Sequence, residues 1–269
     1  MKAEPFQIGD LLKDPQRLIV PIYQRTYAWT RERQLERLFD SIESKARERL
    51  AGAGPAYPHY MGALLLSPRG KFTFGSIPVF DVVDGQQRLT TYQIFIAALR
   101  DTAKSIVEAA LSDQLAPFLL NIDKRLMKEP KLERFKLQTS HYDRELFQDL
   151  LDLDRTALRK KYPAAFFKNG NIRESAEAPL PLRAWWYFRD ETEAFINETG
   201  DNERSLRLTA LSAALLEDFR VIVITLDETD DAQVIFETLN SGGEPLGDRS
   251  AKPGCEARGI VLTTSRASS

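Results

Sequence analysis

The sequence has only one cysteine and two histidines among its 269 residues. A single thiol, Cys255, cannot form a disulfide within the chain, which favours a reducing compartment, and the cytoplasm is the expected location. His59 and His141 are too few to build a histidine-rich metal nuclease centre. We therefore expect both histidines to be structural or to lie on the surface.

Long hydrophobic runs and the common catalytic motifs are also absent. No segment approaches the about 18 consecutive apolar residues of a membrane-spanning helix, and residues 1–10 have no signal-peptide core. The sequence has no GK[ST], G-x-G-x-x-G or H-E-x-x-H motif. Thirty-seven basic and 39 acidic residues give a net charge of -2. Any contact with DNA must therefore come from a local patch.

The most informative stretch covers residues 78–101. Its first half, Val79–Val83, is β-branched and apolar, which predicts a strand buried on both faces. Its second half changes to helical spacing and predicts one buried stripe, formed by Leu89, Tyr92, Ile96 and Leu99. A strand that passes directly into a helix leaves the first helical N–H groups pointing beyond the end of the strand.

The junction between this strand and helix is the run Asp84-Gly85-Gln86-Gln87-Arg88. One interpretation is a capping box, in which Asp84 accepts a helical N–H and Gln87 reaches back to the cap. That interpretation leaves Arg88 unexplained, because a cation in the first turn opposes the helix dipole unless an anion is nearby. We therefore favour a turn that faces a phosphate.

Three ordered motifs resemble a known family. The run V-V-D-G-Q-Q-R-L-T-T, from Val82 to Thr91, is similar to the signature of the DGQQR domain at the front of GmrSD-type modification-dependent restriction proteins. Two further matches are V-P-I-Y-Q-R-T-Y-A-W, from Val20, and I-F-E-T-L-N-S-G-G-E-P-L, from Ile235. The resemblance implies a ParB/sulfiredoxin-like core, a nucleotide site and a role in defence against foreign DNA.

The expected fold class is α+β, with a small mixed β-sheet and a large, mostly helical insertion. Residues 1–101 would form the first part of the ParB-like core, and 102–218 the helical insertion. Residues 219–247 would return to the core with an interior strand at 219–226 and a helix at 232–239. Residues 248–269 are rich in Ser, Arg, Gly and Ala and predict a poorly ordered tail. The family often continues toward an HNH nuclease domain, which we do not find in this sequence.

Two local patterns add smaller expectations. Thr30 is a suitable N-cap for a helix that reaches about Leu50, with Leu35, Leu38, Phe39, Ile42 and Ala46 on its buried side. Four consecutive aromatics, Trp185–Phe188, cannot all face one side of a helix. Packing in the core and between elements is preferred for them over stacking on nucleobases.

The resemblance also implies the residues of a nucleotide site. The expected catalytic residues are Asp84, Gln86, Gln87 and Arg88. Asp84 would position an attacking or metal-bound water, and Gln86 and Gln87 would hold phosphate oxygens or water. Arg88 would neutralise charge on the transferring group. The expected nucleotide-binding residues are Tyr23, Gln24, Arg25, Gly85, Thr90, Thr91 and Asn240. The alternative for the first motif is that its aromatics pack under the next helix while Arg25 pairs with a carboxylate. A family-typical basic residue is replaced by Gly242 in the third motif, which weakens the role of that turn.

Two functions follow from these expectations. The first is a regulatory module of an antiphage restriction system that binds and hydrolyses a nucleoside triphosphate, GTP or ATP, with Mg²⁺. The second is a nonenzymatic scaffold that senses DNA or docks a partner and uses the nucleotide only as a switch. Modified DNA and a nuclease domain or subunit are the candidate partners in both, and the chain could also form oligomers. Direct DNA cleavage by this chain is disfavoured because it lacks a compact cluster of histidines or carboxylates.

Overall fold

A computed structural model of the chain describes residues 1–227, apart from 53–56, 72 and 107, together with 230, 234 and 235. Two sequence predictions therefore lie outside the described residues: the site residue Asn240 and the tail at 248–269. Most of the helix predicted at 232–239 lies outside them as well.

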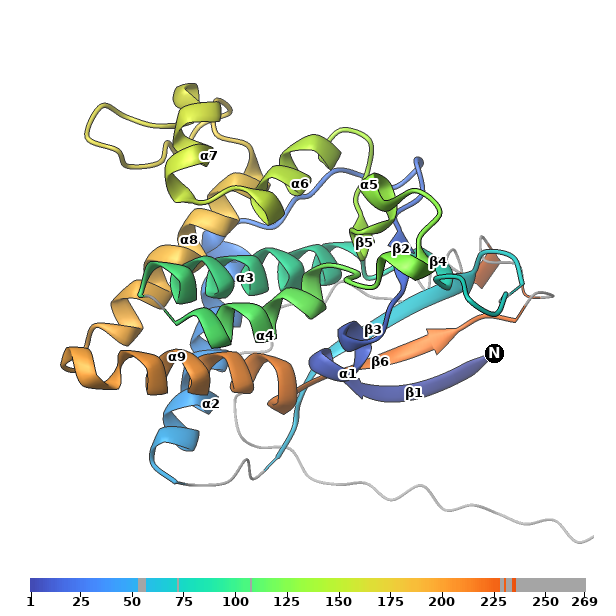
Figure 1. Cartoon of the computed structure of the whole chain (residues 1–269), viewed down its shortest axis with the longest axis horizontal. Helices are drawn as coiled ribbons and strands as arrows, with labels where there is room; N and C mark the ends of the chain where they lie inside the picture. The colour runs from blue at the N-terminus through green and yellow to red at the C-terminus, as the bar shows by residue number, and fades with distance from the viewer. Residues whose placement is uncertain (53–56, 72, 107, 228–229, 231–233, 236–269) are drawn as a thin grey trace, which may run out of the picture.

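The described strands form one six-stranded mixed sheet (Figure 1). From edge to edge they are β1 (Lys2–Gln7), β6 (Phe219–Thr225), β3 (His59–Pro68), β4 (Val79–Asp84), β2 (Arg17–Ile19) and β5 (Leu137–Gln138). The β1–β6 and β3–β4 pairs are antiparallel, and the β6–β3, β4–β2 and β2–β5 pairs are parallel. This confirms the α+β class with a small mixed sheet, and β6 occupies the interior position expected from its valines and isoleucines.

Most of the remaining regular structure in the described chain is helical. They are α1 (Ile8–Lys13), α2 (Glu36–Leu50), α3 (Gln86–Ser105), α4 (Ala109–Leu119), α5 (Pro130–Glu133), α6 (Arg144–Asp152), α7 (Arg155–Lys161), α8 (Leu180–Ile196) and α9 (Arg204–Ala213). The segment 102–218 is mostly helical as expected, although it also contributes β5 to the edge of the sheet. One continuous hydrophobic core contains side chains from the sheet and from these helices.

The central helix α3 is buried far more completely than its sequence pattern indicates. Almost every residue from Gln86 to Ala103 is buried, so the expectation of a single buried stripe is wrong. The reason is that other helices pack around α3 (Figure 1). The Phe95 ring stacks on Phe188 of α8 with centroids 4.3 Å apart, and the buried Gln93 donates its side-chain N–H to the Phe118 carbonyl of α4 at 2.7 Å.

The helix after Thr30 starts differently from the prediction. Thr30 makes no side-chain cap, and the chain first forms a π-helical turn over Arg31–Leu35 before α2 begins. The Thr30 N–H instead donates to the Gln34 side chain at 3.1 Å. The predicted buried side of α2 is confirmed, because Leu38, Phe39, Ile42 and Ala46 all lie in the core.

The aromatic run on α8 is part of the core, as preferred from the sequence. Trp185, Trp186 and Phe188 are buried, and Tyr187 is partly buried against them. The Arg155 guanidinium lies over the Trp186 ring, 4.6 Å from its centroid. The three buried rings are therefore held within the protein and do not form an exposed stacking surface.

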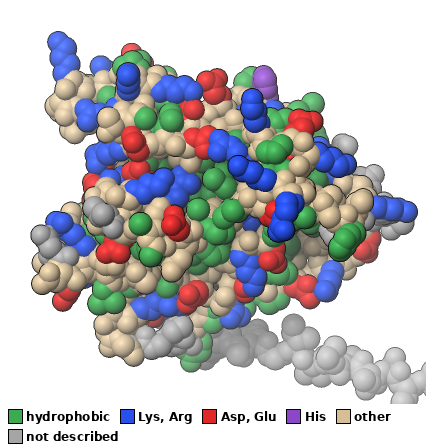
Figure 2. Space-filling model, viewed as in Figure 1, with side chains coloured by type: hydrophobic (Ala, Val, Ile, Leu, Met, Phe, Trp, Pro, Cys, Tyr) green, Lys and Arg blue, Asp and Glu red, His purple; other side chains and the backbone are tan. Residues whose placement is uncertain are grey.

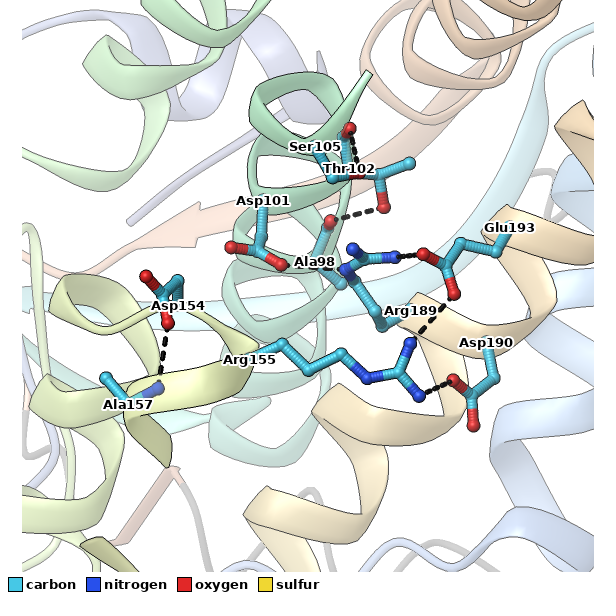
Figure 3. A network of polar contacts seen from close by, with 10 residues as sticks. All are labelled: Ala98, Asp101, Thr102, Ser105, Asp154, Arg155, Ala157, Arg189, Asp190 and Glu193. Carbon is cyan, nitrogen blue, oxygen red and sulfur yellow. Dashed lines mark hydrogen bonds and ion pairs between the residues drawn. The ribbon is translucent and has the colours of Figure 1, made fainter. Parts of the chain in front are cut away.

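A network of charges lies beside that aromatic cluster (Figure 3). Arg189 of α8, only 4% exposed, donates to Asp101 of α3 at 2.7 Å and pairs with Glu193. Arg155 of α7 donates to the same Glu193 at 2.9 Å and to Asp190 at 3.0 Å. Burial raises the pKa of Asp190, and the Arg155 charge opposes that shift. The network ties the C-terminal half of α3 to α7 and α8.

Charges of both signs are mixed on one face of the molecule (Figure 2). On the face shown in Figure 2, hydrophobic side chains are visible in the middle, and basic and acidic side chains alternate around them. No single sign of charge dominates this face, in line with the net charge of -2. Regions with an excess of one sign are therefore local.

Candidate functional site

A cleft of about 540 Å³ opens where β4 ends and α3 begins. Two separate segments line it: the loop that follows β2, and the turn between β4 and α3. The lining residues are Gln24, Arg25, Trp29, Asp84, Gly85, Gln86, Gln87 and Arg88. The structure thus brings together the first and second sequence motifs, which are about 60 residues apart.

The turn into α3 depends on a glycine. Gly85 has φ +88° and ψ 11°, a left-handed conformation that side chains other than glycine rarely adopt. A Cβ atom there would lie 2.3 Å from Leu64 Cδ2 and 3.0 Å from the Ala63 carbonyl oxygen of β3. Gly85 is itself the N-cap of α3 and has no side-chain cap, while Asp84 is the last residue of β4. The alternative interpretation of this turn as a capping box between Asp84 and Gln87 is therefore excluded.

The two glutamines of this turn hold the neighbouring loop. Gln87 accepts the Ala28 N–H at 2.8 Å and donates to the Thr26 carbonyl at 3.0 Å. Gln86 donates to the Arg25 carbonyl at 3.0 Å. Both side chains are buried, and both polar atoms of Gln87 are engaged by the loop backbone. Gln87 therefore shapes the cleft wall, whereas Gln86 keeps one amide oxygen without a hydrogen bond to any described residue.

Further bonds fix the same loop from other directions. Gln24 donates to the Val83 carbonyl of β4 at 2.9 Å. The buried Tyr27 hydroxyl lies 2.8 Å from the Thr91 hydroxyl oxygen, and burial raises the pKa of Tyr27. The Tyr27 N–H donates to Asp143, next to α6, at 2.7 Å. Asp143 was not expected to support the site, because nothing near it in the sequence points to a loop more than a hundred residues earlier.

The charged groups of the cleft are two arginines and one carboxylate. Arg25 is exposed and makes no side-chain hydrogen bond or ion pair with any residue that the structure describes. Arg88, with a 27% exposed side chain, donates from Nη2 to the Ala63 carbonyl, and the same atom lies 3.4 Å from Asp84. The Arg88 Nε is buried without a partner among the described residues. The lining therefore carries one net positive charge.

The start of α3 adds to this positive character. The first backbone bond of the helix joins the Leu89 N–H to the Gly85 carbonyl at 3.0 Å. The N–H groups of Gln86, Gln87 and Arg88 precede that bond and have no acceptor within the helix. A helix of 20 residues also places the positive end of its dipole here. The cleft is therefore suited to an anion.

Three predicted site residues do not line the cleft. Thr90 and Thr91 are buried, and the Thr91 hydroxyl donates to the Gln87 carbonyl at 2.8 Å, which corrects the expectation that these hydroxyls face a ligand. Tyr23 is 72% exposed and lies outside the lining. A fourth, Asn240, is beyond the described part of the chain.

Neither His59 nor His141 lines the cleft. His59 packs against Phe219 with ring centroids 4.7 Å apart, and burial, assisted by Lys45, lowers its pKa. Within the described ranges, no three side chains of His, Cys, Asp or Glu are grouped to hold a metal ion. None of the described helices is long and apolar enough to cross a membrane.

Comparison with known families gives one clear match. The model of the family described as GmrSD restriction endonuclease, N-terminal domain, matches residues 8–249 of the chain. The match includes both motifs that meet in the cleft. No curated protein matches the chain significantly.

Proposed function

The chain belongs to the family of GmrSD restriction endonuclease N-terminal domains, which makes it a component of a restriction system, and we propose that it binds and hydrolyses a nucleoside triphosphate as the regulatory module of that system. This proposal rests on one observation: Arg25 and Arg88 line the same cleft at the start of α3. Modified DNA and a nuclease domain or subunit are the partners of the module.

The phosphates would bind at the first turn of α3. Unpaired backbone N–H groups and the helix dipole favour a negative charge there. Arg25 would bind the phosphates as an exposed and unpaired cation, and Arg88 would neutralise charge that develops during transfer. A volume of about 540 Å³ lies within the range of small-molecule pockets, about 300–1,000 Å³.

Asp84 is the remaining charged group of the cleft. Its side chain is 46% exposed, so it can orient an attacking water while keeping its charge solvated. It is also the one carboxylate in the lining. Mg²⁺ commonly binds through one or two carboxylates together with substrate phosphates, so the residues present fit this ion, which would supply charge neutralisation. Gln86 would contribute its free amide oxygen, and Gln87 would position the loop.

A nonenzymatic switch is the second candidate, and one observation favours it. Arg88 Nη2 already donates to the Ala63 carbonyl, and Gln87 has no amide atom left for a ligand. With those groups engaged, the cleft could hold a nucleotide without hydrolysing it. In that case the bound nucleotide would change only how the module binds its partners.

The two candidates are separated by comparing binding with phosphate release. Arg88→Ala is tested against Arg37→Ala, an exposed arginine on α2 that lines no cleft. GTP and ATP are each tested with Mg²⁺, with and without modified DNA. We expect wild type and Arg37→Ala to release phosphate and Arg88→Ala to lose this activity. Binding by all three proteins without release in any would support the switch.

Binding itself is tested by thermal unfolding. A ligand at 100 times its Kd stabilises the folded state by about 2.7 kcal/mol, which raises the Tm. Arg25→Ala should reduce this shift without changing the Tm of the free protein, because the Arg25 side chain makes no bond within the described structure. An unchanged Tm of wild type with millimolar GTP and ATP would refute the nucleotide site.

A further inference from the structure

A second cleft, of about 550 Å³, lies at the other end of the same pair of strands. β2 and β4 are parallel, and both begin at this second cleft and end near the first one. The loop between β3 and β4 and the segment around α5 form its two sides (Figure 1). Its charged lining consists of Arg17, Arg69, Lys71, Lys128 and Glu133.

Four cations against one carboxylate is an unusual excess for a chain whose net charge is -2. Two of the cations are held in place: Arg17 lies 3.7 Å from Glu133 and donates to Gln138 at 3.3 Å, and Arg69 donates to Asp81 at 3.1 Å. These two side chains are therefore held in place and partly neutralised.

The other two cations are free to meet a ligand. Lys71 and Lys128 are exposed, lie on opposite sides of the cleft and form no ion pair with any described residue. Exposed basic side chains continue along the α5 side at Lys124, Arg125 and Lys131, of which Arg125 pairs with Asp123 at 2.7 Å. The segment 124–131 also contains the exposed Glu129, and Lys124 and Lys131 face a neighbouring cleft that contains Glu145, Asp149 and Asp152. Its basic side chains nevertheless outnumber its one acidic side chain by four to one.

Apolar groups lie among these charges. The cleft lining includes Ile77, Val79 and Phe80. Phe74 lies outside the lining, in the same β3–β4 loop as Lys71, and is 97% exposed. An exposed aromatic ring three residues from an exposed lysine suits a ligand that carries both phosphates and flat rings, because the ring can stack on a base while the cations bind the backbone. A single small anion would use neither the length of the basic region nor Phe74.

We propose that this second cleft and the basic segment 124–131 bind the phosphodiester backbone of a nucleic acid without reading its sequence. Cations on two sides of one cleft can contact several phosphates, and such contacts release counterions and make binding depend on salt. The surface is separate from the nucleotide cleft, so the inference does not rest on the proposed nucleotide function.

The test uses the whole chain with short fluorescein-labelled nucleic acids, one duplex and one single strand. Anisotropy is measured between about 50 and 200 mM salt, where each phosphate contact contributes about 0.9 to the slope of log K against log salt. Lys71→Ala/Lys128→Ala is compared with Lys160→Ala/Lys168→Ala, which removes two exposed lysines away from both clefts. Phe74→Ala is measured with the single strand.

We expect the Lys71/Lys128 variant to bind more weakly by about tenfold or more near 0.1 M salt and to lose about two units of slope, while the Lys160/Lys168 variant keeps both values. Both variants should keep the wild-type urea midpoint and the nucleotide-induced Tm shift. Three outcomes would overturn the proposal. The wild type could fail to bind either nucleic acid, or the two double-lysine variants could lose equal affinity for nucleic acid. The third is that the wild type binds phosphatidylserine vesicles as tightly as it binds nucleic acid. Loss of the Tm shift in Arg25→Ala with nucleic-acid binding intact would concern the nucleotide site alone.

Discussion

Gln87 offers the sharpest test of how the candidate site is built. If its role is to hold the loop, Gln87→Met should destabilise the protein, because methionine keeps the length of the side chain and loses both hydrogen bonds. The bonds to Ala28 and Thr26 contribute about 1 kcal/mol each. Ala28 and Thr26 are exposed, so water can replace the lost partners and no penalty for a buried unpaired group is added. The expected loss is therefore about 2 kcal/mol.

The measurement is urea unfolding at neutral pH. The midpoint should fall without a change in the m-value, since the surface exposed on unfolding stays the same. Gln148→Met is the matched control, because Gln148 is a half-buried glutamine on α6 whose side chain bonds to no described residue. The control should stay within about 0.5 kcal/mol of wild type.

Gln87→Glu adds a readout that depends on pH. A carboxylate could still accept the Ala28 N–H, but its second oxygen would face the Thr26 carbonyl, which Gln87 Nε2 now meets at 3.0 Å. The neutral acid can donate to that carbonyl, so the folded state should raise the pKa of the introduced group. Stability relative to wild type should therefore recover as the pH falls through that raised value. A Gln87→Met protein with the wild-type midpoint but no phosphate release would refute a positioning role and indicate contact with the ligand.

Two further predictions concern buried charges away from the cleft. Asp101→Ala leaves Arg189 buried with Glu193 as its remaining acid, and we expect a loss of about 3 kcal/mol in urea unfolding, at the low end of the cost of breaking a buried pair. Lys136, 1% exposed, donates to the Asp14 carbonyl at 2.5 Å, and burial lowers its pKa from 10.5 to about 8. Below about pH 8, Lys136 is protonated in both the folded and the unfolded protein. Between about pH 8 and pH 10.5 the unfolded protein binds more protons than the folded protein. The free energy of unfolding should therefore rise by about 1.4 kcal/mol per pH unit over this range. Lys136→Met should lack that rise in unfolding measured at about pH 7.5 and 9.5, and equal pH slopes would contradict it.

The strand, turn and helix around Asp84–Arg88 could be predicted from sequence because their signals are local. The change from a β-branched run to helical spacing marks the boundary, and a glycine there predicts a close approach. The approach is made by Leu64 and Ala63 of the protein itself, whereas the prediction assigned it to a ligand. A glycine in a sequence indicates that a side chain would not fit at that position, but it does not indicate which atoms occupy the space.

The failures at this site have one physical cause. The single buried stripe is inferred from neighbours three and four residues apart, and the ligand-facing threonines are inferred from a motif of ten consecutive residues. Gln87 and Thr91 instead bond to the loop around Tyr27, and Gln93 bonds to α4. Partners this far away in the sequence leave no periodic signal, so polar residues that satisfy them look like surface or site residues.

The arrangement of the two clefts limits how a signal could leave the nucleotide site. β4 spans about 20 Å between them, and its backbone bonds to β2 and β3 fix the register, so a shift along the strand would break several bonds at once. The loop that carries Arg25 has backbone bonds at Val20 and Gln24, and its contacts with α3, β4 and Asp143 beside α6 are bonds that involve a side chain. A ligand that pulls Arg25 inward would act on the Gln86 bond to the Arg25 carbonyl, on the Gln24 bond to the Val83 carbonyl of β4 and on the Tyr27–Asp143 bond. A change at the nucleotide cleft should therefore reach the start of α3, the end of β4 and the segment before α6, and of these only β4 leads directly to the second cleft.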